Sequence, residues 1–444
     1  MRQKIDLLLK PRWVVRVEPD CSPLRHHAVA VHDTRIVACL PAAEAEQRFA
    51  ADSTVDLPDH VLIPGLVNAH VHAGMNLLRG FADDLPLMRW LSEAIWPAEA
   101  EHASAAFVRD GSLLAAAEML AGGITTCNDM YFFPEAAAEA FDRVGMRAMI
   151  GMVVIEFPTA YASGPDDYLA KGLAIRDNWK GYDRLQFCLA PHAPYTVSDD
   201  TFKRILNLAD ELDLTIHVHL HETTSEISQA IEQTGMRPLE RLDRLGIVGP
   251  NLLAVHAVHL DAAEITTLRA KGSRVVHCPS SNMKLASGIA PVRELLAAGI
   301  PVALGTDGAA SNNRLDLFQE MRHAALLAKV ASSNASAVPA HQALWMATMG
   351  GAHAIGMEST VGSITEGKQA DLVAISLASL ETQPCFDPVS QLVYAAGREH
   401  VSHVWVDGNL SAENGKVLQI SNRELLAIAA LWQNKLKGKA APIY

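Results

Sequence analysis

Short apolar runs alternate with longer amphipathic stretches from about residue 61 to residue 350. The apolar runs predict eight buried strands, at residues 61–72, 123–130, 147–157, 184–192, 214–222, 251–259, 273–281 and 300–308. The intervening stretches have helical periodicity, for example at residues 104–121, 199–212, 261–271, 290–299 and 314–331. Strands that alternate with helices in this way predict an α/β fold, a parallel (β/α)8 TIM barrel.

The two ends of the chain have a different pattern. Residues 1–58 consist of short strands and turns without helical periodicity. After a helix near residues 340–356, further short strands follow, and a last helix covers roughly residues 422–437. We expect both termini to pair into one small β-sandwich beside the barrel. The predicted domains are a composite β-sandwich (1–58 and 362–420), a barrel (59–361), and a C-terminal helix and tail (421–444).

Composition narrows the class of protein. Hydrophobic residues make up 49% of the 444-residue chain and charged residues 20%, as in ordinary globular proteins. The formal net charge of −13 disfavours nucleic acid or an anionic membrane as the main partner. The six cysteines are scattered without a C-x-x-C pair, and no apolar run is long enough to span a membrane. We therefore expect a cytoplasmic protein.

Histidine and acidic side chains gather where the predicted strands end. Barrel enzymes carry their active sites at these C-terminal strand ends. The residues found there are His70, His72, His192, His217, His219, His221, Glu222, His256, His259, His277 and Asp307. His70 and His72 face the same way on a strand, so both imidazoles can hold one metal ion. A histidine of the fifth strand and Asp307 would complete a nitrogen and oxygen site suited to Zn²⁺, or less often Fe²⁺.

A metal site of this kind predicts hydrolysis. An ion with an open position lowers the pKa of a bound water toward 7, and Glu222 can act as both base and acid for its proton. Motifs of other mechanisms are absent. The chain lacks H-E-x-x-H, the H-x-E and P-C-x-x-C pair, G-x-G-x-x-G, the P-loop and G-x-S-x-G. Metal-assisted hydrolysis is therefore the predicted chemistry.

Several segments resemble motifs of the amidohydrolase superfamily. They are PGLVNAHVH (64–72), HLHE (219–222), HAVHL (256–260), HCPSSNMKLASGIAPV (277–292), LGTDGAASNN (304–313) and GSITEGKQADLV (362–373). Two further segments resemble the 5′-methylthioadenosine/S-adenosylhomocysteine deaminase family within it, namely MRWLSEAIWPAEA (88–100) and APHAPYTVS (190–198). The resemblance covers nearly the whole chain.

The resemblance implies a role for individual residues. The implied ligands of one divalent ion, Zn²⁺ with Fe²⁺ as the alternative, are His70, His72, His219 and Asp307. Glu222 is implied as the proton shuttle, and His256 is implied to help Asp307 orient the attacking hydroxide. The expected substrate contacts are Glu99, on the ribose hydroxyls, together with Glu222, His192, Trp90, His277 and Asn282.

The implied reaction is deamination of an adenine nucleoside by a hydrolase acting on C–N bonds of cyclic amidines. Some family members carry an arginine after the third strand, and residues 152–164 here lack one. This absence favours a small apolar 5′ group, as in 5′-methylthioadenosine, over S-adenosylhomocysteine, with adenosine also possible. The alternative is a guanine, modified-purine or s-triazine aminohydrolase or chlorohydrolase. A catalytically inactive scaffold is disfavoured because no implied ligand is missing. We also expect a homodimer or higher homo-oligomer.

Three histidines beside the implied ligands have other expected roles. His217 lies one repeat deeper in its strand than His219, so we expect it to be structural. His221 could line the pocket mouth, and His259 is expected in a loop behind the ligands. The roles of His221, His259 and His277 stay open at this point.

Overall fold

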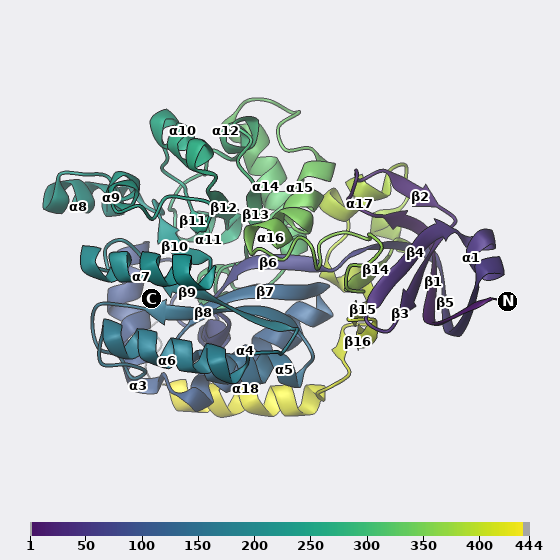
Figure 1. Cartoon of the computed structure of the whole chain (residues 1–444), viewed down its shortest axis with the longest axis horizontal. Helices are drawn as coiled ribbons and strands as arrows, with labels where there is room; N and C mark the ends of the chain where they lie inside the picture. Colours follow the sequence, from purple (N-terminus) through teal and green to yellow (C-terminus); the bar gives the residue numbers. More distant parts are fainter. Residues whose placement is uncertain (1, 438–444) are drawn as a thin grey trace.

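The computed structural model describes residues 2–437 and contains two sheets (Figure 1). One is an eight-stranded parallel sheet that curls into a barrel. The other has nine strands and combines segments from both ends of the chain. The predicted class, a (β/α)8 barrel with a flanking sheet, is confirmed. No helix among the described residues is long and apolar enough to cross a lipid bilayer.

The barrel strands follow one another around the sheet in sequence order. They are β6 (Leu66–Val71), β7 (Ile124–Tyr131), β8 (Arg147–Val154), β9 (Leu185–Pro191), β10 (Ile216–Leu220), β11 (Leu252–His256), β12 (Arg274–His277) and β13 (Val302–Leu304). Every residue of these strands is buried except Gln186. Burial on both faces explains why the strands read as continuous apolar runs without alternation.

Side-chain hydrogen bonds close the barrel between β13 and β6. The Asn68 amide donates to Thr306 Oγ1 at 2.8 Å, and Asn68 Oδ1 accepts from the Thr306 N–H at 2.9 Å. One residue further on, the Asp307 N–H donates to the His70 carbonyl at 3.1 Å. Closure therefore places the end of the first barrel strand beside the end of the last.

Helices cover the outside of the barrel. They are α4 (Ala105–Ala121), α5 (Pro134–Arg143), α6 (Pro165–Asn178), α7 (Asp199–Leu212), α8 (Thr224–Thr234), α9 (Pro238–Arg244), α10 (Ala262–Lys271), α12 (Val292–Ala297), α14 (Leu317–Ala331), α15 (Ala340–Met346) and α16 (Met349–Ala354). Two short helices, α11 (Pro279–Lys284) and α13 (Ala309–Asn312), lie instead at the C-terminal ends of the strands. Polar residues cap the N-termini of several helices. The Ser198 side chain accepts a hydrogen bond from the Thr201 N–H at the start of α7, and Asp261 forms a capping box with Glu264 at the start of α10.

The segment between β6 and α4 contributes to the cavity at the end of the barrel strands. It contains the 3-10 helix η1 (Ala73–Leu78), the short helix α2 (Leu87–Trp90), a π-helical turn η2 (Leu91–Ile95) and α3 (Trp96–His102). The aromatic and methionine-rich stretch at residues 88–96 lies here, and its Trp90, Ile95 and Trp96 line the cavity.

The flanking sheet joins the two ends of the chain. Its strands are β1 (Gln3–Val15), β2 (Pro23–Arg25), β3 (His27–His32), β4 (Arg35–Pro41), β5 (Phe49–Pro64), β14 (Leu372–Ser376), β15 (Val401–Val406), β16 (Asn409–Glu413) and β17 (Lys416–Val417). The junction is an antiparallel pairing of β5 with β14. Between β14 and β15 lie η3 (Leu380–Thr382), α17 (Pro388–Tyr394) and η4 (Arg398–His400).

Two local predictions for this region were wrong. Residues 61–64, predicted as the start of the first barrel strand, belong to β5 and pair with β14. The chain passes from one sheet to the other at Gly65, where a Cβ atom would lie 2.0 Å from Thr125 Oγ1, so only glycine fits. The helix α1 (Ala42–Arg48) lies within residues 1–58, where no helix was predicted. Its seven residues are too few for a periodic pattern.

A C-terminal helix, α18 (Asn422–Leu436), lies where the sequence predicts one and packs along α4. Trp432 Nε1 donates to Asp110 Oδ2 at 2.7 Å, and its ring meets Phe107 edge-on. The predicted tail at residues 438–444 lies outside the described residues. The division into domains stays a prediction.

Arg147 joins the barrel to the flanking sheet, and its replacement by methionine should destabilise the protein. Its buried guanidinium donates to Asp371 at 3.0 Å and also to Asp407. Arg147→Met leaves Asp371 buried without a cation and leaves Asp407 only Arg184, whose Nη1 lies 3.8 Å away, which costs about 3–5 kcal/mol of unfolding free energy. The thermal unfolding midpoint should fall clearly. It should not move in the control Arg89→Met, which breaks only an exposed pair with Glu93. Equal midpoints for the two variants would contradict the proposed link.

Candidate active site

A cavity of about 480 Å³ opens at the C-terminal ends of the barrel strands. Most of the lining residues are apolar. Many of them come from the α2–α3 segment and from the loop that follows β8. The charged, imidazole and phenol groups of the lining are His72, Glu99, Tyr131, Tyr161, His192, Tyr195, His219, Glu222, His256 and Asp307. No lysine or arginine of the described chain is among the lining residues.

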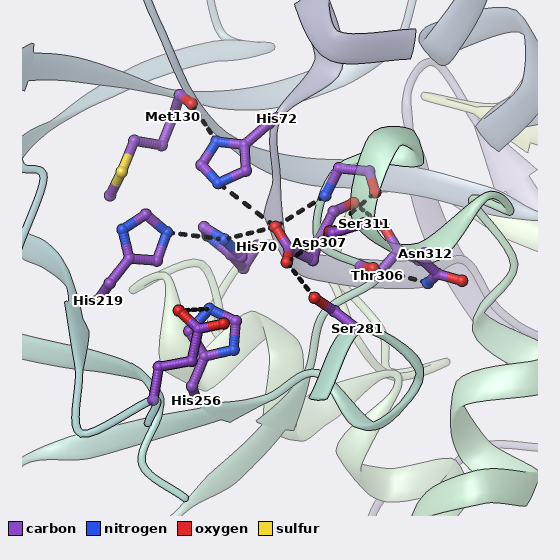
Figure 2. A network of polar contacts seen from close by, with 12 residues as sticks. His70, His72, Met130, His219, His256, Ser281, Thr306, Asp307, Ser311 and Asn312 are labelled. Atoms are coloured by element: carbon purple, nitrogen blue, oxygen red, sulfur yellow. Dashed lines mark hydrogen bonds and ion pairs between the residues drawn. The ribbon is translucent and has the colours of Figure 1, made fainter. Parts of the chain in front are cut away.

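Three histidines and one aspartate converge at this cavity (Figure 2). His70 and His72 come from the end of β6 and His219 from β10, and one ring nitrogen of each lies within 4.8 Å of the others. Asp307 Oδ1 lies 3.4 Å from His70 Nε2 and 3.3 Å from His72 Nε2. Three imidazoles and a carboxylate are a donor set that suits a divalent transition metal. The described residues therefore fit a metal site.

The other ring nitrogen of each histidine is also occupied. His72 Nδ1 lies 2.5 Å from the Met130 carbonyl, and His219 Nδ1 lies 2.7 Å from the His192 carbonyl. Because a carbonyl only accepts, these Nδ1 atoms carry the proton and each Nε2 keeps a lone pair facing the centre. Burial lowers the pKa of His70 to about 4, so its ring is neutral at pH 7, the state that binds a metal.

His217 lies behind this cluster and does not line the cavity. Its Nε2 is 2.9 Å from His70 Nδ1, and its ring is fully buried. When His70 Nε2 binds a metal, its Nδ1 proton can be donated only to this acceptor. We therefore infer that His217 has a structural role, because this hydrogen bond fixes the orientation of the His70 ring.

Asp307 uses its two oxygens differently. Oδ1 faces the histidines and accepts from the Gly308 N–H at 2.8 Å. Oδ2 accepts from the hydroxyls of Ser281 at 2.5 Å and Ser311 at 2.8 Å. Burial alone would raise the pKa of Asp307, but the adjacent imidazoles of His70 and His72 hold it well below its usual range. The sequence reasoning missed both serines, although they lie inside the quoted motifs.

Glu222 faces His256 across the cavity. Its Oε2 lies 3.7 Å from His256 Nε2, and Ser287 Oγ donates weakly to Oε1 at 3.5 Å. His256 Nδ1 donates to Asn282 Oδ1 at 2.9 Å, so a neutral ring presents an unprotonated Nε2 to Glu222. Burial raises the pKa of Glu222. A raised pKa suits a carboxyl group that both takes and gives a proton near neutral pH.

Glu99, Trp90 and His192 line the cavity with Glu222. Glu99 Oε1 accepts from Tyr131 Oη at 2.7 Å, and burial raises the pKa of Glu99 to about 7. His192 Nδ1 is 2.9 Å from a threonine hydroxyl, and burial lowers the pKa of His192 to about 3. Trp90 Nε1 is buried without a hydrogen-bond partner among residues 2–437, which leaves it free to donate to a ligand. The sequence did not predict the contact between Tyr131 and Glu99, because no local motif around Tyr131 indicates a functional residue.

Other histidines of the region do not reach the cavity. His277 and Asn282 are buried and absent from the lining, and Asn282 instead holds His256. Their predicted contact with substrate has no support in this geometry and stays a prediction. His221 does not line the mouth either, since its Nε2 accepts from the Leu239 N–H at 3.0 Å. His259 Nε2 donates to the Ser287 carbonyl at 2.6 Å, so it anchors a loop.

The fold and this site together define a class: a (β/α)8 barrel protein whose strand ends bring together four side chains that fit a metal ion, beside a buried carboxyl group. The chain belongs to the amidohydrolase family, whose family model matches residues 61–411. The predicted resemblance is confirmed, and the protein is a hydrolase that acts on C–N bonds.

Individual relatives cover the chain almost completely. It is 45% identical over 435 residues to a 5-methylthioadenosine/S-adenosylhomocysteine deaminase of Teredinibacter turnerae, with 98% of both chains covered. It is 40% identical over 423 residues to a 5′-deoxyadenosine deaminase of Methanosarcina mazei, with 95% of this chain and 96% of that one covered. The crystal structure of an adenosine deaminase from Xanthomonas campestris with bound zinc is 48% identical, with a TM-score of 0.97 over 98% of this chain and 99% of that one.

Proposed function

We propose that the protein deaminates adenine nucleosides by hydrolysis, with 5′-methylthioadenosine as its preferred substrate and Zn²⁺ as its metal. The products are the corresponding inosine analogue and ammonia. The names of the relatives support an adenine nucleoside, and the zinc in the similar crystal structure supports the choice of ion.

The observation that carries the proposal is the Glu99 carboxyl group in the cavity wall. Tyr131 Oη donates to its Oε1 at 2.7 Å, and the carboxyl group lines the cavity. A carboxylate oxygen is a strong acceptor for a sugar hydroxyl. A free base or an s-triazine has no hydroxyl at this place, so a ribose accounts for the group better.

The reaction follows from the positions of the acid–base groups. A divalent ion held by the four ligands would supply hydroxide at neutral pH from a bound water. Glu222 is placed to hold the proton that this chemistry releases and to deliver it to N1 of the adenine ring. Asp307 takes the second proton and passes it to the amino group, which leaves C6 as ammonia. His256, oriented by its hydrogen bond to Asn282 Oδ1, keeps Glu222 in place and hydrogen-bonds the oxygen that adds to C6.

The lining supports a small 5′ group. The loop after β8 presents Phe157, Pro158, Ala160 and Tyr161 to the cavity. No cation of the described chain lines it, so the carboxylate of an amino-acid tail would find no partner. A methylthio group, in contrast, is apolar and contacts aromatic rings favourably. The proposal therefore ranks methylthioadenosine above S-adenosylhomocysteine.

Replacing Glu99 with glutamine should separate nucleosides from free bases. Loss of a charge-assisted hydrogen bond to ribose should lower kcat/KM for methylthioadenosine by about 10- to 100-fold. Activity on adenine should not change. Because the pKa of Glu99 is about 7, the ionised acceptor is lost as pH falls, so KM for the nucleoside should rise below that pH. This dependence should vanish in Glu99→Gln. The measurement is steady-state ammonia release against pH.

The matched control is Glu93→Gln, an exposed glutamate on the adjoining turn. It should behave as the wild type on both substrates. Equal losses on nucleoside and free base in Glu99→Gln would favour the guanine, modified-purine or s-triazine alternative. The predicted oligomer and cytoplasmic location stay predictions.

A further inference from the structure

The chain turns sharply between the metal ligand His219 and Glu222. Strand β10 ends at Leu220, and His221 adopts a left-handed backbone conformation with φ of 55°. That conformation is unfavourable for a residue with a Cβ atom, so surrounding contacts have to maintain it. The turn is what brings the Glu222 side chain into the cavity.

Glu226 contacts this turn with both of its carboxylate oxygens. Oε1 accepts from the His221 N–H at 3.1 Å, and Oε2 accepts from the Glu222 N–H at 2.8 Å. Glu226 lies in the first turn of α8, where Thr223 Oγ1 accepts from its N–H and so begins the helix. The sequence spacing Glu222-x-x-x-Glu226 therefore brings the second carboxyl group back onto the backbone of the first.

Among residues 2–437, these two backbone hydrogen bonds are the interactions that explain a carboxyl group at position 226. Glu226 is only 8% exposed, and its two carboxylate oxygens bond backbone N–H groups rather than a cation. Burial raises its pKa to about 7, although the two N–H groups oppose that rise. It does not line the cavity, so it does not contact substrate. The His221 ring holds the same turn from its other side, through Leu239 and His259.

We propose that Glu226 is a positioning residue that fixes the backbone of Glu222 and thereby aims its carboxyl group at His256 and the substrate. The inference rests on the proposed deamination, because it concerns the proton shuttle of that reaction. Proton transfer depends steeply on geometry, and a displacement of about 1 Å can cost on the order of 10²-fold in rate.

Glu226→Gln tests the proposal with little change in volume. The amide offers one acceptor oxygen, and its NH₂ group faces the second N–H donor, so one of the two bonds is lost. Zinc-loaded enzyme should lose about tenfold to hundredfold in kcat on methylthioadenosine. KM and zinc content should stay close to wild type. Hydrogen exchange should be faster at the amides of His221 and Glu222. The matched control is Glu232→Gln, an exposed glutamate on the same helix.

Glu226→Asp gives a second measurement should the glutamine variant fold poorly. It keeps both oxygens but is shorter by one methylene, so kcat should again fall with little change in KM. Unchanged kcat in a folded variant, whether or not amide exchange accelerates, would overturn the proposal. If the wild-type enzyme released no ammonia from any adenine nucleoside, the proposed function would fail instead. The role of Glu226 would still be tested by hydrogen exchange, because an unchanged exchange rate at His221 and Glu222 in Glu226→Gln would refute it.

Discussion

Replacing Glu222 with glutamine lowers kcat for adenine-nucleoside deamination by about 10²- to 10⁴-fold, the range that a positioned acid–base group contributes. The amide keeps the size of the side chain but cannot carry a proton between water and the ring. The carboxyl group is buried, its pKa is raised, and it lies 3.7 Å from His256. Zinc content should stay at the wild-type level, because Glu222 is not among the converging ligand atoms.

The measurement pairs ammonia release with metal analysis of the same sample. Glu232→Gln, already the control for Glu226, serves here too, since it makes the same change at an exposed site. A Glu222→Gln enzyme that keeps more than about a tenth of wild-type kcat would show that another group moves the proton.

His219→Ala should abolish stable metal binding and, with it, activity. It removes one of three ring nitrogens that lie within 4.8 Å of one another. His217→Ala removes no ligand but deprives His70 Nδ1 of its partner at 2.9 Å. Loss of such an outer partner typically weakens metal affinity by about 10- to 100-fold. Metal analysis after dialysis against a graded chelator separates the two outcomes.

The matched control for both is His341→Ala, an exposed histidine far along the chain from the cluster. It should retain metal at every chelator concentration that the wild type tolerates. Complete and equal metal loss in His217→Ala and His219→Ala would mean that the ligand of the fifth strand was misassigned.

The barrel could be predicted because its strands are buried on both faces and bounded by amphipathic helices. The sequence pattern did not reveal the passage at Gly65, since residues 61–64 are as apolar as the strand that follows. It depends on close contact with Thr125, a residue remote in sequence. The helix α1 was missed because two turns of alanine-rich chain carry no period.

The sequence predicts those parts of the site that depend on the spacing of residues along one strand. Alternate positions predict that His217, His219 and His221 share one face, and the motif resemblance selected His219. In the structure β10 ends at Leu220, so His221 does not share that face. The partners that fix each ring come from distant strands, as the Met130 carbonyl does for His72. The same holds for Tyr131 beside Glu99. Such contacts form only when the barrel has closed, so no local sequence pattern predicts them.

Ammonia release by zinc-loaded enzyme tests the central claim most directly. The panel is 5′-methylthioadenosine, S-adenosylhomocysteine, adenosine, guanine and an s-triazine, each compared by kcat/KM. The account predicts the highest value for methylthioadenosine, lower values for the other two adenine compounds, and little or no release from guanine or the triazine. A preference for guanine or the triazine over every nucleoside, or no release from any of them, would contradict it.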